Sequence, residues 1–158
     1  MIAVLKKQYT LVQGSRAVVL NFIETEVGDD LNTPVPAYNN STIRYLLEHN
    51  ASCYFNWLAY FAMKQPGESI KDTDFTTAPL LRQLYARVDE VVAAFFDHFK
   101  DTMEVPVSGI HSRNGLVSAT PLELFTHVIT HEFHHKGQMM SMCRMLGYTP
   151  PDTDVSRF

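Results

Sequence analysis

Apolar residues recur along this chain at the three- and four-residue spacing of amphipathic helices. The first such segment covers residues 2–27, and a glycine follows it as a natural stop. The second begins after a loop at residues 31–39, where two prolines forbid a continuous helix. Asn40 or Ser41 is suited to cap this second helix, which is expected to run to about Met63.

Two further helices are predicted in the second half of the chain. One covers residues 77–99 and has the wide apolar face of a core helix. The other opens with Thr120-Pro121-Leu122-Glu123, which combines an N-cap threonine, a proline at the first helical position and a glutamate that completes a capping box. It ends at Gly147, shortly before two prolines. Between these helices, Asn114-Gly115 favours a small hairpin or a loop.

Four helices in a chain of 158 residues predict an all-α four-helix bundle that forms a single domain, residues 1–158. Hydrophobic residues at 46% and charged residues at 19% are typical of a soluble globular protein. No apolar run is long enough to cross a bilayer, and the first residues lack the pattern of a signal peptide, so no membrane association is expected.

Charge and cysteine content narrow the possible partners and the compartment. The chain has 13 Lys and Arg against 17 Asp and Glu, so nucleic acid is not an expected partner. Cys53 and Cys143 lie far apart among apolar helix positions, which suits buried, inert thiols in a reducing compartment. We therefore expect a cytoplasmic protein.

Four histidines lie within nine residues of the last predicted helix: His127, His131, His134 and His135. Residues four apart share a helix face with Cβ atoms about 6 Å apart, so two imidazoles at that spacing can reach one ion. His127 and His135 are about 12 Å apart along the axis, which is too far for a shared ion. Three pairs are left open by spacing alone: His127 with His131, His131 with His134, and His131 with His135.

Two histidines do not complete a metal site, and His49 is the best candidate for a third ligand. Leu46 and Cys53 continue its helix face, so its imidazole is expected to point into the bundle. Three neutral imidazoles leave coordination positions open for water or substrate, which is typical of a catalytic rather than a structural site. His98 resembles an exposed helix residue and His111 a loop residue, and neither is assigned a role.

The run from His131 to His135 also matches the HExxH motif of zinc metalloproteases, in which the glutamate is the general base. This alternative fails on the third ligand. Gln138 and Ser141 occupy the positions where the metzincin pattern has Gly and His, and no glutamate follows Glu132. Glu132 remains a candidate acid or base near the ion, although a solvated helix position is the simpler expectation.

Three stretches of the chain resemble the DinB/YfiT family of metal-dependent enzymes: Leu46-Leu47-Glu48-His49-Asn50, the run His127-Val128-Ile129-Thr130-His131-Glu132-Phe133-His134-His135-Lys136-Gly137-Gln138, and Leu146-Gly147-Tyr148-Thr149-Pro150-Pro151. The resemblance covers nearly the whole chain in helix order and length. It implies a four-helix bundle with crossed connections and a divalent ion, usually nickel or zinc, held by His49, His131 and His135. Lys136 stands where the family often has arginine, and His127 is left as a packing or supporting residue.

Members of this family include thiol-S-transferases that use low-molecular-weight thiols such as bacillithiol or mycothiol, a thiol-dependent isomerase and a proposed hydrolase. The resemblance implies a metalloenzyme that acts on a small-molecule substrate by thiol transfer or hydrolysis, and a homodimer formed through the first and last helices. A divalent ion suits both chemistries, because it stabilises a thiolate or lowers the pKa of a bound water. The competing class is a non-catalytic bundle, with a structural metal or none, that works as a binding or dimerising module.

Overall fold

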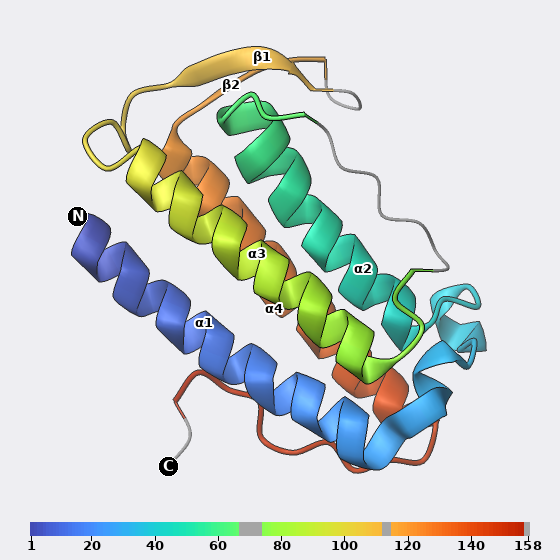
Figure 1. Cartoon of the computed structure of the whole chain (residues 1–158). Helices are drawn as coiled ribbons and strands as arrows, with labels where there is room; N and C mark the ends of the chain where they lie inside the picture. Colours follow the sequence, from blue (N-terminus) through green and yellow to red (C-terminus); the bar gives the residue numbers. More distant parts are fainter. Residues whose placement is uncertain (67–73, 112–114, 157–158) are drawn as a thin grey trace.

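The computed structural model describes residues 1–66, 74–111 and 115–156, and four long helices form a bundle within them (Figure 1). A small antiparallel hairpin lies across one end of the bundle (Figure 1). The all-α architecture predicted from the sequence is confirmed. The elements are, in chain order, α1 (Ile2–Phe22), the π-helical η1 (Ile23–Val27), the 3₁₀ turns η2 (Gly28–Asn32) and η3 (Pro36–Tyr38), α2 (Ile43–Tyr54), the π-helical η4 (Phe55–Ala62), α3 (Ala78–His98), β1 (Val107–His111), β2 (Gly115–Ala119) and α4 (Pro121–Met145).

The helices pack in an order that differs from their order in the chain. α1 and α2 each pack mainly against α3 and α4, so the connections from α1 to α2 and from α3 to α4 cross the ends of the bundle. α2 and α4 run antiparallel, side by side (Figure 1). The core between the helices is rich in aromatic rings, and its largest fully buried side chains include Tyr54, Phe61, Phe95, Phe96 and Phe125.

The starts of α4 and α2 show how local chemistry sets helix boundaries. Thr120 and Glu123 form the predicted capping box: the Thr120 backbone N–H donates to the Glu123 carboxylate at 2.7 Å, and the Glu123 N–H donates to the Thr120 hydroxyl at 3.2 Å. The prediction that Asn40 or Ser41 caps α2 is wrong. Thr42 caps this helix by accepting from the Tyr45 N–H at 3.0 Å, because Ser41 is held in a β-bridge with Val35.

The hairpin predicted as one of two alternatives is present, with its strands paired from Val107 opposite Ala119 to His111 opposite Gly115. Gly115 has a φ of 70°, a conformation that glycine adopts without strain. Asn114, the other half of the predicted turn, lies outside the described residues. The hairpin packs on η4 and so covers the end of the bundle where α4 begins.

One buried polar network links all four helices. Arg16 of α1 is 5% exposed, and its guanidinium makes two parallel hydrogen bonds, at 2.8 and 2.9 Å, to the carboxylate of Glu132 on α4. Arg16 also donates to Asp89 of α3 at 2.7 Å. Tyr54 of α2 donates to Glu132 at 2.5 Å, and Tyr9 donates to Asp89 at 2.6 Å. Because every charge is paired and hydrogen-bonded, this network meets the condition under which ions are tolerated in a core.

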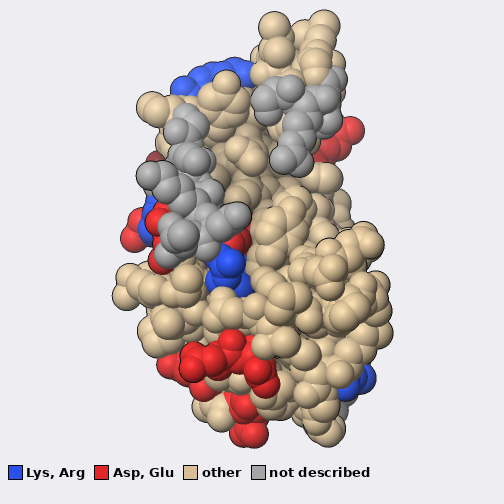
Figure 2. Space-filling view, turned by 90° about the vertical axis from the view of Figure 1, so that its right-hand side faces the viewer, with Lys and Arg blue, Asp and Glu red and all other residues tan. Residues whose placement is uncertain are grey.

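Charged side chains are unevenly distributed over the surface of the protein. On the face drawn in Figure 2, most of the described surface is uncharged, acidic side chains gather toward one end, and basic side chains stand in small separate groups. Within the described ranges, none of the helices combines the length and the apolar character that crossing a bilayer would require.

We expect Arg16→Met to lower the free energy of unfolding of the metal-free protein by about 3–5 kcal/mol, because it leaves the Glu132 carboxylate buried without its cation. Urea unfolding followed by circular dichroism measures the change. Arg82→Met is the matched control. Arg82 pairs with Glu24 at 2.6 Å, but both side chains are more than a third exposed, so this loss should cost about 1 kcal/mol or less. Equal losses in the two variants would contradict the role given to the buried pair.

Candidate metal centre

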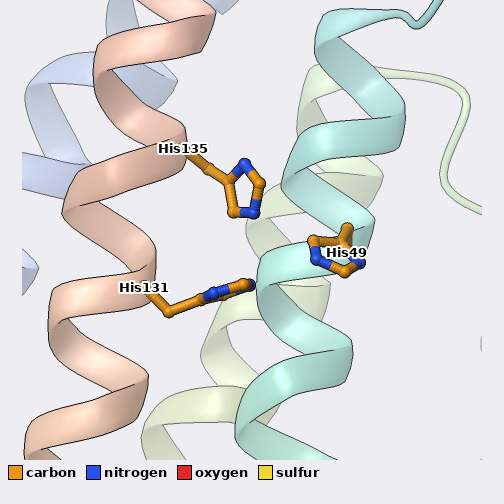
Figure 3. Close-up of side chains that lie close together, drawn as sticks. All are labelled: His49, His131 and His135. Atoms are coloured by element: carbon orange, nitrogen blue, oxygen red, sulfur yellow. The ribbon is translucent and has the colours of Figure 1, made fainter.

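α4 turns a row of histidines toward α2. His131 and His135 are four residues apart and share one face of the helix, with ring centroids 4.4 Å apart. His49 reaches them from α2, and its ring centroid lies 5.1 Å from that of His131 and 4.9 Å from that of His135. Figure 3 shows the three rings converging between the two helices. The structure thus brings together the three histidines that the family resemblance singled out.

The ring nitrogens are placed for a shared ion. One nitrogen from each of His49, His131 and His135 lies within 4.8 Å of the other two. Ligands at about 2 Å from a tetrahedral ion are about 3.3 Å apart, so small ring rotations would close the set. Nε2 of His131 is buried and has no hydrogen-bond partner among the described residues, which is unusual for a buried polar atom. A divalent ion would satisfy it, and the donor set therefore fits a metal.

Burial keeps these imidazoles in the form that binds metals. Burial, together with charge repulsion from the neighbouring His135 and His49, lowers the pKa of His131 from its ordinary value of 6.5 to about 4. Burial also lowers the pKa of His135, while the hydrogen bond that its ring donates to Gln138 acts in the opposite direction. Both rings are neutral at neutral pH, with a lone pair available for an ion.

Gln138, one turn after His135 on α4, orients that ring. Its side-chain oxygen lies 2.5 Å from Nδ1 of His135. An amide oxygen only accepts hydrogen bonds, so Nδ1 carries the proton and the lone pair stands on Nε2. This is the arrangement by which proteins commonly fix the tautomer of a histidine ligand.

The sequence profile of the DinB family matches residues 1–158. This chain belongs to the DinB family. Protein DinB of Bacillus subtilis (strain 168) is 23% identical to it over 124 residues, which cover 74% of this chain and 72% of that protein. The family resemblance drawn from the sequence is confirmed.

The other two histidines of α4 occupy different places in this DinB-family chain. His134 is exposed and lies beside His135, with ring centroids 5.0 Å apart, but it does not join the group of potential ligands. His127 is also exposed, and its ring lies 5.7 Å from that of His131 and 5.4 Å from that of Trp57. Together with Cys53 and His131, His127 forms a second group of potential ligands.

His111 is not the loop residue that the sequence suggested. It is the last residue of β1, is 8% exposed and stacks on Trp57 with ring centroids 4.2 Å apart and planes 5° apart. The hairpin folds back onto η4 and buries this ring, a long-range contact for which the sequence carries no local signal. His98 is exposed at the end of α3, as expected.

The expectation that Glu132 is solvated is wrong. It is 6% exposed, and its carboxylate accepts hydrogen bonds from Arg16 and Tyr54. One residue along an α-helix turns the side chain by about 100°, so Glu132 points into the core toward α1 while His131 points toward α2. The cation that makes this burial possible comes from a position 116 residues away. A carboxylate held in this way is poorly placed to act as the base of a zincin-type protease.

We expect Gln138→Ala to weaken divalent metal binding about 10–100-fold, because His135 loses the partner that fixes its tautomer and ring orientation. Competition with a chromophoric chelator measures the affinity. Gln83→Ala removes the same side chain from an exposed position on α3 and should leave the affinity unchanged. An unchanged affinity in Gln138→Ala would show that the ring is positioned without this contact.

The free energy of unfolding of the metal-free protein should decrease as the pH falls from about 6.5 to about 4. Over this window His131 takes up a proton in the unfolded chain but not in the folded one, because its folded pKa is about 4. His131→Gln should therefore lose less stability over the same window, measured by urea unfolding at successive pH values. His98→Gln, altered at an exposed site, should keep the wild-type dependence. An identical pH dependence in His131→Gln and wild type would contradict the assignment.

Proposed function

We propose that this DinB-family chain is a metal-dependent enzyme in which His49, His131 and His135 hold one divalent ion, nickel or zinc. The observation that carries the proposal is the convergence of three imidazoles from two helices, with one nitrogen of each within 4.8 Å of the others. Three protein ligands leave at least one coordination position for a substrate, which is the composition of a catalytic site. Family membership supports the same assignment.

In this proposal the protein positions the three histidine ligands of the ion. α2 and α4 are packed helices, so the three histidines are held by rigid elements rather than by loops. The rings are only partly buried, which leaves them within reach of a small molecule. When bound, the ion supplies a Lewis acid for a thiol or for an oxygen of the substrate.

We infer that the nucleophile comes from outside the protein. Burial raises the pKa of the Cys53 thiol to about 12, so this residue is protonated at neutral pH and lacks the reactive thiolate form. Glu132 is committed to Arg16 and Tyr54. A low-molecular-weight thiol or a water molecule would then be the second reactant, which corresponds to transferase or hydrolase chemistry on a small-molecule substrate.

We also propose that the chain forms a homodimer through α1 and α4. An apolar groove of about 440 Å³ runs between these helices. Val4 and Leu11 of α1 are exposed, and Leu11 also lines this groove. Apolar surface of this kind is typical of protein interfaces. The groove is lined by Gln8, Leu11, Val12, Ile129, Thr130, Phe133 and Val155.

Nickel content tests the proposed site. Protein purified without a histidine tag, loaded with nickel and desalted should carry about one ion per chain by elemental mass spectrometry. His49→Ala, His131→Ala and His135→Ala should each lose it. His134→Ala is the matched control, because it removes an exposed histidine from the same turn of α4, and it should retain the ion. Nickel that persisted in His49→Ala combined with Cys53→Ser would contradict the cross-helix site. No binding in the wild type would favour a non-catalytic bundle.

An added thiol distinguishes an open site from a closed one. A small thiol added to nickel-loaded Cys53→Ser protein should produce a sulfur-to-nickel charge-transfer absorption, because a site with three protein ligands leaves a position for it. The Cys53→Ser background ensures that the sulfur is not that of this nearby cysteine. A spectrum unchanged by the thiol would support a structural ion instead.

A further inference from the structure

A second group of potential ligands lies one helical turn from the three histidines. Cys53 follows His49 by four residues on α2, and His127 precedes His131 by four residues on α4. Because the two helices run antiparallel, these steps lead in the same direction along the bundle. Sγ of Cys53 and one nitrogen each of His127 and His131 lie within 4.8 Å of one another. The two groups of potential ligands are thus displaced from each other by one helical turn, about 6 Å along the helix axes.

We propose that Cys53, His127 and His131 form a second metal position, selective for thiophilic ions such as cadmium or zinc. One sulfur and two imidazole nitrogens make a softer donor set than three imidazoles. Three ligands of these types are sufficient to hold a tetrahedral ion and leave one position for solvent or a ligand. This assignment stands on the Cys53 group itself and does not depend on the function proposed above.

The surroundings of the second position suit an ion. The Cys53 sulfur lies in an 8% exposed residue, whereas His127 is exposed, so an ion can enter from the His127 side. Binding replaces the sulfur–hydrogen bond by a sulfur–metal bond and releases one proton to solvent, with no change of oxidation state. The Trp57 ring contacts the His127 ring and stacks on the ring of His111, so these aromatic side chains border the second position.

The two positions exclude each other because they share His131. A neutral imidazole has one nitrogen that can donate a lone pair, so His131 serves one ion at a time. His131 is then the residue that both groups of potential ligands have in common, and the coordination of an ion bound to it can be completed by either group. The nature of the ion decides which position is filled. Ions that prefer nitrogen ligands bind at His49 and His135, and thiophilic ions bind at Cys53 and His127.

Cadmium binding to the full-length His135→Ala protein tests the second position without the first. Cadmium should bind at about one ion per chain and produce a sulfur-to-cadmium charge-transfer absorption. Adding Cys53→Ser should abolish this absorption. Adding either Cys53→Ser or His127→Ala should weaken binding by at least the roughly 10–100-fold that is typical when a supporting partner of a metal ligand is lost, because here the ligand itself is removed. Cys143→Ser is the matched control, because it alters the other buried free cysteine, and it should leave the signal unchanged. Absence of the absorption in His135→Ala, or its persistence without Cys53, would overturn the proposal.

Competition tests the sharing of His131. Wild-type protein loaded with one equivalent of nickel should show no cadmium–thiolate absorption until cadmium displaces the nickel. Binding of both ions at once would overturn the proposal that the two positions share His131.

Thermal unfolding of each variant shows whether it is folded, and Cys53→Ser keeps nearly the shape of the native side chain. Nickel titration of Cys53→Ser reports on the three histidines alone, so failure of the second position and failure of the proposed enzyme site are distinguishable.

Discussion

The ion pair between Arg16 and Glu132 is the constraint on which the rest of the structure depends. Two charges buried in an aromatic core are tolerated only with close, well-oriented partners, and here Asp89, Tyr9 and Tyr54 complete the set. The bidentate contact fixes the rotation of α4 about its axis. Because His131 immediately precedes Glu132 in the chain, that rotation also affects which way the histidines face. The core and the candidate metal centre are thus set by one contact.

Helical periodicity then organises the chemistry. The four-residue step that places His131 one turn before His135 also places His127 one turn before His131, and the same step on α2 relates His49 to Cys53. Two donor sets of different softness follow from one pair of antiparallel helices, with His131 in common. The hairpin adds what the helices lack, since it brings His111 onto Trp57 at the end of the row of rings.

The acidic side chains and the thiol near the three histidines differ in role from the histidines themselves. The two carboxylates adjacent in sequence to these histidines, Glu132 and Glu48, are paired with Arg16 and Arg44, and burial raises the pKa of the nearby Cys53 thiol, which keeps it protonated. What remains at the convergence of α2 and α4 is a set of neutral nitrogen donors. Such a set of donors is suited to bind a divalent ion.

The sequence by itself determined the four helices, the capping box at Thr120 and the three histidines that meet, because these depend on local periodicity, on cap chemistry and on motifs typical of the family. Tertiary structure alone decided the burial of Glu132, the place of His111 and the cap at Thr42. Each of these three depends on a partner outside its own segment: Arg16 for Glu132, Trp57 for His111, and the bridge of Val35 to Ser41 for Thr42. The spacing of residues along one helix carries no information about such contacts.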